Sequence, residues 1–88
     1  AAVSTDQASY QAGQPVTATF SGMPGNATEY IAISPTGSPN SSIVQYQLTN
    51  SAASGTVMFT GLPAGDYAAR AYFQSYVVAA RSVHFIVN

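Results

Sequence analysis

The chain has 88 residues, of which 6% are charged, and its formal net charge is −1. So few charges argue against long-range electrostatic steering of nucleic acids or anionic lipids, and uncharged polar side chains must supply the solubility. The chain has no cysteine, which excludes disulfides, thiolate metal ligands and thiol nucleophiles. No run approaches the roughly 18 apolar residues of a transmembrane helix.

Apolar and polar residues alternate with a period of two along the whole chain, and this pattern predicts β-strands. Clusters of Gly, Pro, Asn and Ser separate the strands, as expected for turns. Seven strands are expected, at about 3–5, 16–20, 30–33, 43–48, 55–60, 67–73 and 77–87. The sequence therefore predicts one all-β domain over residues 1–88, a seven-stranded antiparallel sandwich of the immunoglobulin-like or fibronectin-III-like kind.

The same alternation assigns side chains to the faces of the strands. In the strand 67–73, Ala68, Arg70 and Tyr72 are expected on the face opposite to Tyr67. The groups expected to share one face of their strand are Val57 with Phe59; Tyr67 with Ala69, Ala71 and Phe73; Val44 with Tyr46 and Leu48, opposite Gln45 and Gln47; and Val83 with Phe85 and Val87.

Two turn sequences echo each other, FSGMPG at 20–25 and FTGLPAG at 59–65. In an immunoglobulin-like sandwich, the links that fall here both cross from one sheet to the other. An apolar Met23 or Leu62 can close the end of the core, and the proline that follows stops the strand. We interpret the echo as convergent corner chemistry and not as duplication.

The second echo leads into a further pattern, in which Leu62, Gly65 and Tyr67 match a tyrosine corner. In such a corner the tyrosine ring is buried and its hydroxyl bonds back to the preceding turn. We therefore assign these three residues a structural role.

Three stretches carry a resemblance: SYQAGQPVTATFSGMPGNATEYIAISPTG, SGTVMFTGLPAGDYAARAYF and ARSVHFIV. They resemble the small immunoglobulin-like modules appended to secreted bacterial hydrolases and are distantly similar to the SKICH-type domain. Those modules often carry an Asp-Trp pair where this chain has Glu29-Tyr30. The resemblance covers nearly all the chain and implies a secreted, non-catalytic accessory module, but it carries over no binding site.

Residues suited to catalysis or metal binding are few. His84 is the sole histidine and stands beside Phe85 in an apolar strand, without a Gly-x-Ser-x-Gly motif, so we expect no enzyme. Asp6, Glu29 and Asp66 occupy separate turn regions and form no evident catalytic pair. They could bind calcium only if their loops met at one end of the sandwich, so we expect no metal or cofactor.

The candidate ligand-binding residues are Arg70 and Arg81, on neighbouring strands, with Tyr72 and Tyr76 beside them. Tyrosine and arginine exposed on a flat sheet would suit a polysaccharide or a protein surface. In the alternative interpretation, the aromatic rings shield the sheet and an arginine pairs with Glu29 or Asp66.

Two functions remain open. The first is a non-catalytic extracellular module that attaches to a polysaccharide or protein surface. The alternative is a structural subunit that assembles into an extracellular fibre or layer, because no lysine guards the strand edges and the final VHFIVN could pair with another chain. Neither function involves nucleic acid or membrane insertion. Ala1-Ala2 fits a mature end left after removal of a signal peptide.

Overall fold

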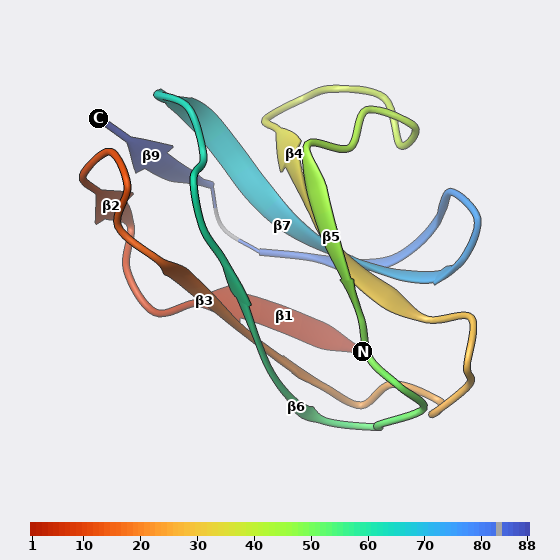
Figure 1. Cartoon of the computed structure of the whole chain (residues 1–88). Coiled ribbons are helices and arrows are strands. Elements are labelled where there is room, and N and C mark those ends of the chain that lie inside the picture. The colour runs from red at the N-terminus through yellow and green to blue at the C-terminus, as the bar shows by residue number, and fades with distance from the viewer. Residues whose placement is uncertain (83) are drawn as a thin grey trace.

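A computed structural model describes residues 1–82 and 84–88 of the chain. These residues contain no helix, and so none that is long and apolar enough to cross a membrane. Their strands form two facing sheets, as in a sandwich (Figure 1). Val83 lies outside the described residues, so its predicted alignment with Phe85 and Val87 stays a prediction. The strands are β1 (Ala2–Thr5), β2 (Ser9–Tyr10), β3 (Val16–Ser21), β4 (Tyr30–Pro35), β5 (Gln45–Leu48), β6 (Gly55–Phe59), β7 (Gly65–Gln74), β8 (Val77–Arg81) and β9 (Phe85–Val87).

The smaller sheet has three antiparallel strands in the order β1-β3-β6. Its central strand β3 shows the predicted alternation, because Val16, Ala18 and Phe20 are buried while Thr19 is exposed. The apolar side chains therefore point toward the other sheet, and the hydroxyl-bearing ones point away from it.

The larger sheet has six strands, in the order β2-β9-β7-β4-β5, with β8 also paired to β7. The single last strand predicted from the sequence is two segments, because β9 pairs with residues 65–67 of β7 and β8 with residues 70–74. The two-residue strand β2, which the sequence did not predict, pairs in parallel with β9. Strand β9, in the final VHFIVN that was expected to pair with another chain, has a strand partner on each side and so offers no free edge.

A single hydrophobic core lies between the sheets. Tyr10 and Phe85 meet there edge to face, with ring centroids 5.4 Å apart. Burial, followed by a hydrogen bond from its hydroxyl to Asp6, raises the pKa of Tyr10. The core residues are Val3, Tyr10, Val16, Ala18, Phe20, Met23, Ile31, Ile33, Phe59, Leu62, Tyr67, Ala69, Ala71, Phe85 and Val87.

The two echoed turns are equivalent corners of the sandwich. Each leads from the three-stranded sheet to the larger one, as predicted, from β3 to β4 and from β6 to β7. Gly22 and Gly61 both have left-handed backbones, with φ of +67° and +71°, and each is followed by a buried apolar residue, Met23 or Leu62. Because β3 and β6 are antiparallel, the corners close opposite ends of the core.

The corner before β7 has the geometry of the predicted tyrosine corner at Tyr67. The ring is buried, and its hydroxyl donates a 2.7 Å hydrogen bond to the carbonyl oxygen of Pro63. A Cβ on Gly65 would lie 3.2 Å from this ring, so the glycine leaves room for it. The bond fixes the turn against the strand that follows.

The segment 36–44, between β4 and β5, covers the outer face of the larger sheet. It is attached at both ends, because Thr36 N–H donates to the carbonyl of Asp66 and Val44 N–H donates to that of Ile33. Strand β4 is consequently buried on both faces. Ala32 and Ser34 on its outer face are as inaccessible as Ile31 and Ile33 on its core face.

Strand β5 turns its apolar face outward. Tyr46 and Leu48 are more than half exposed. The glutamines on the opposite face reach the other sheet, where Gln45 Nε2 donates to the carbonyl oxygen of Thr60 at 2.6 Å and Gln47 Nε2 to that of Met58 at 3.5 Å. These side chains occupy carbonyls on β6 and just after its end, along an edge that has no strand partner in the described residues.

Candidate functional site

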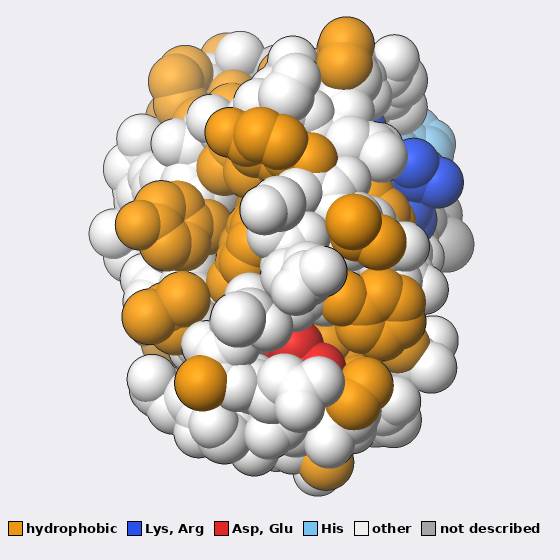
Figure 2. Space-filling view, turned by 90° about the vertical axis from the view of Figure 1, so that its right-hand side faces the viewer, with side chains coloured by type: hydrophobic (Ala, Val, Ile, Leu, Met, Phe, Trp, Pro, Cys, Tyr) orange, Lys and Arg blue, Asp and Glu red, His pale blue; other side chains and the backbone are white. Residues whose placement is uncertain are grey.

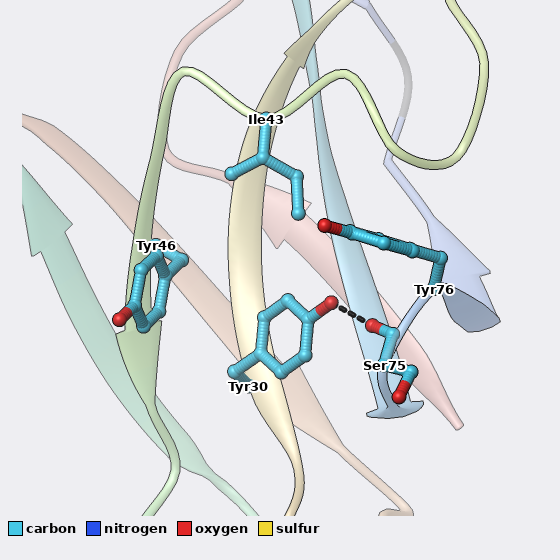
Figure 3. Close-up of a pocket in the computed structure, with 5 residues that line it drawn as sticks. All are labelled: Tyr30, Ile43, Tyr46, Ser75 and Tyr76. Carbon is cyan, nitrogen blue, oxygen red and sulfur yellow. Dashed lines mark hydrogen bonds between the residues drawn. The ribbon is translucent and has the colours of Figure 1, made fainter.

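One side of the molecule combines hydrophobic and uncharged polar side chains with few charges (Figure 2). On the outer face of the larger sheet lies a groove of about 360 Å³, lined by Tyr30, Ile43, Tyr46, Ser75 and Tyr76 (Figure 3). Its walls come from the start of β4, from β5 and its preceding segment, and from the turn between β7 and β8. Three tyrosines from three places in the sequence thus meet around one hollow.

Tyr30 forms the fixed floor of this tyrosine groove. Its ring stacks on Tyr72, with centroids 4.7 Å apart and planes inclined by 6°, and meets Tyr46 edge to face at 5.8 Å. Its hydroxyl donates to the carbonyl oxygen of Ser75 (Figure 3). Burial, and then the nearby hydroxyls of Tyr72 and Tyr76, raise the pKa of Tyr30. The ring is therefore neutral and held in one orientation.

Tyr46 and Tyr76 form the open sides of the groove. Their side chains are 59% and 53% exposed. Tyr76 lies in the two-residue turn after Gln74, where Ser75 has a left-handed backbone with φ of +44°. From this turn the Tyr76 ring extends toward Ile43 (Figure 3). Two accessible rings and a fixed third ring are thus available to a ligand.

Two of the four predicted ligand-binding residues are buried. Arg70 is 2% exposed, and Tyr72 is completely covered. Both lie on the outer face of the sheet, as the alternation predicts, but the segment 36–44 folds over them. The guanidinium of Arg70 donates to the carbonyls of Ser38 at 2.7 Å and Pro39 at 2.9 Å. The predicted exposed patch is therefore wrong for these two residues, which hold the segment in place.

The other two predicted residues are accessible but separated. Tyr76 precedes β8, whereas Arg81 is the last residue of that strand. Only Tyr76 lines the tyrosine groove. The exposed Arg81 donates to Asn40 Oδ1 at 3.1 Å. The four residues therefore do not form one site.

The three carboxylates do not converge. Glu29 precedes β4, while Asp66 lies near the opposite end of the same strand pair, where β7 passes the end of β4. Asp6 accepts hydrogen bonds from Tyr10 and from the backbone of Thr17. The described residues contain no group of three acidic, histidine or cysteine side chains that could hold a metal ion.

No arginine pairs with a carboxylate in the described residues, so that alternative interpretation is wrong for Glu29 and Asp66. Asp66 instead contacts His84, with Oδ1 3.0 Å from Nδ1, and accepts a 2.8 Å hydrogen bond from Thr36. The Thr36 bond, and then His84, hold the pKa of the Asp66 carboxyl below its usual value. Both partners are about half exposed, so water competes for the contact.

No protein-family model matches the chain, and no curated protein is significantly similar to it. The functional assignment therefore rests on the tyrosine groove. Of its residues, sequence reasoning selected Tyr76 and missed Tyr30 and Tyr46. Both lie on outward positions of adjacent strands, but only the pairing of β4 with β5 brings their rings together.

Proposed function

We propose that the protein is a non-catalytic extracellular module that binds a polysaccharide or protein surface through the tyrosine groove. The observation that carries the proposal is the meeting of Tyr30, Tyr46 and Tyr76 around one hollow. Binding sites are typically concave, rich in aromatic side chains and supplied with a few polar groups. The extracellular location and the accessory role rest on the resemblance to modules of secreted bacterial hydrolases.

The chemistry of the groove favours an uncharged ligand. Its lining residues carry no formal charge, and the pKa of Tyr30 is raised, so that hydroxyl stays protonated. Tyrosine rings offer apolar faces for the C–H faces of a sugar ring or for an apolar side chain, and the hydroxyls offer hydrogen bonds. A neutral sugar chain fits these properties best.

We also propose that the sandwich is of the seven-stranded immunoglobulin-like or fibronectin-III-like kind. Two arrangements support it: β1 and β2 are consecutive strands at edges of different sheets, while β8 and β9 pair with successive parts of β7. If each of these pairs counts as one interrupted strand, nine segments become seven. The hydrogen bond from Tyr67 to Pro63 adds the corner typical of this fold.

We expect Tyr76→Ala to weaken binding to a neutral glycan about tenfold, because it removes an accessible ring from the groove without exposing the core. Retention on cellulose, chitin and starch would identify the glycan. Titration with its soluble oligosaccharide, followed by NMR shifts, would then give the affinity.

Met58→Ala is the matched control, because Met58 is as exposed as Tyr76 but lies outside the tyrosine groove. It should leave both retention and affinity unchanged. If Tyr76→Ala binds like the control, or if the shifts on binding fall away from Tyr30 and Tyr46, the groove is not the site.

A second candidate function, a subunit of a fibre or layer, is favoured by the side of the sandwich where β5 and β6 lie. These strands are edges of the two sheets, and they expose Leu48 and Met58. Exposed apolar residues on edge strands favour association between copies.

If this second function holds, light scattering should show a mass that rises above 9.1 kDa with concentration. Leu48→Lys should suppress the rise, because a lysine on an edge strand opposes further strand pairing. Val77→Lys, at a similarly exposed position on β8, should leave it unchanged. A constant monomer mass at all concentrations would contradict assembly.

A further inference from the structure

All the arginine and histidine side chains of the chain lie around one hollow. The sequence has two arginines, one histidine and no lysine. Arg70, Arg81 and His84 all line a hollow of about 440 Å³ between residues 36–38 and the strands β7 and β8. At the right-hand edge of Figure 2, blue cationic atoms lie beside the pale blue histidine. This clustering contrasts with the low charge of the rest of the surface.

The two arginines are direct neighbours across the strands. Arg70 on β7 is the register partner of Arg81 on β8. Like charges directly opposite each other destabilise a sheet. With only two arginines in the chain, their placement opposite each other costs stability unless an anion lies near both.

Arg70 is also a buried cation without a carboxylate partner. Its terminal nitrogens bond only to neutral oxygens, those of Ser38, Pro39 and Tyr72. Its Nε is buried and has no hydrogen-bond partner. In the described part of the chain, the one carboxylate within ion-pair distance of a basic side chain is Asp66, which contacts His84. Buried charges are normally paired, but this one has no anionic partner among the described residues.

Neither of the nearby carboxylates bonds to an arginine in the described residues. Asp66 contacts His84 and Thr36. Asp6 lines the adjacent hollow together with Arg81 and His84, but its hydrogen bonds go to Tyr10 and Thr17. Arg81 is exposed, and its hydrogen bond to Asn40 uses one guanidinium nitrogen. The guanidinium therefore keeps donors for a ligand.

We propose that this hollow binds an oxyanion, either a planar carboxylate or a tetrahedral sulfate or phosphate group carried by a ligand. Arg81 supplies the direct hydrogen bonds, since a guanidinium fork matches two oxygens of such a group. His84 borders the same space, and Arg70 adds a positive charge from beneath the surface. The site is distinct from the tyrosine groove and does not depend on the function proposed for it.

The test is an NMR titration of the wild-type protein with sodium sulfate, phosphate and acetate, with sodium chloride at equal ionic strength as reference. Because the chain has two arginines, their two Nε–H signals report directly on the site. Both should shift and saturate with at least one oxyanion and not with chloride. Acetate as the strongest ligand would identify a carboxylate site, and sulfate or phosphate as the strongest would identify a tetrahedral one.

Arg81→Gln should weaken this binding at least about tenfold, because it removes a charged donor pair. Asp66→Asn should strengthen binding, since it removes the carboxylate next to His84. Tyr76→Ala should leave the anion affinity unchanged. Shifts that do not saturate, shifts that chloride reproduces, or an Arg81→Gln variant that binds like wild type would each overturn the proposal.

Discussion

Replacing Arg70 by alanine is expected to lower the free energy of unfolding by about 3 kcal/mol. The guanidinium donates to the carbonyls of Ser38 and Pro39 and to Ser38 Oγ, and the whole side chain is buried. Its loss removes the guanidinium donor of the Ser38 carbonyl, leaves the Pro39 carbonyl with the Ser42 N–H alone among the described residues, and opens a cavity beneath the segment 36–44. Urea unfolding measured by circular dichroism would give the difference.

Arg81→Ala is the control for this prediction, because Arg81 is the register partner of Arg70 but is exposed. Exposed substitutions of this kind usually change stability by less than about 0.5 kcal/mol. Removing either arginine relieves the repulsion between them, so this term cancels in the comparison. Equal effects of the two substitutions would show that Arg70 does not hold the segment.

Arg70 and Tyr72 show where reasoning from the sequence stops. The alternation in 67–73 correctly separates Tyr67, Ala69 and Ala71 in the core from Ala68, Arg70 and Tyr72 on the outer face. A period of two identifies a face but not what covers it. Residues 36–42 of the covering segment are turn residues without periodicity, so the path of the segment over the sheet follows only from tertiary contacts.

The corners were more predictable because their chemistry is local. Gly22 and Gly61 permit left-handed backbones, and Met23 and Leu62 then enter the core. The Tyr67 bond likewise spans only four residues. Such features are set by neighbours in the sequence, and a spaced motif can therefore indicate them.

The tyrosine groove depends instead on register. Tyr30 meets Tyr46 and Tyr72 because β4 pairs with β5 on one side and with β7 on the other. A shift of one residue in either pairing would turn those rings to the opposite face. The sequence predicts the strands β4, β5 and β7 but not their pairings, so it indicated Tyr76 and not Tyr30 or Tyr46.

Glu29 is the residue on which the floor of this groove most depends. Its side chain is completely buried, and Oε1 accepts hydrogen bonds from the backbone N–H groups of Gly25 at 3.0 Å and Asn26 at 3.1 Å. These bonds close the turn that leads directly into Tyr30. The other carboxylate oxygen, Oε2, has no hydrogen-bond partner among the described residues.

We expect Glu29→Ala to lower the free energy of unfolding by about 3 kcal/mol, since two partly buried N–H groups lose their acceptor and a cavity replaces the side chain. Glu29→Gln should cost only about 1 kcal/mol, because its amide oxygen can accept both bonds and its NH₂ replaces the unpaired Oε2. Chemical denaturation would give both values, and ring contacts between Tyr30 and Tyr46 in nuclear Overhauser spectra would report on the groove. These contacts should weaken in Glu29→Ala and persist in Glu29→Gln. If the two variants are equally stable and keep the same ring contacts, the carboxylate does not hold the turn, and the stacking on Tyr72 alone must fix Tyr30.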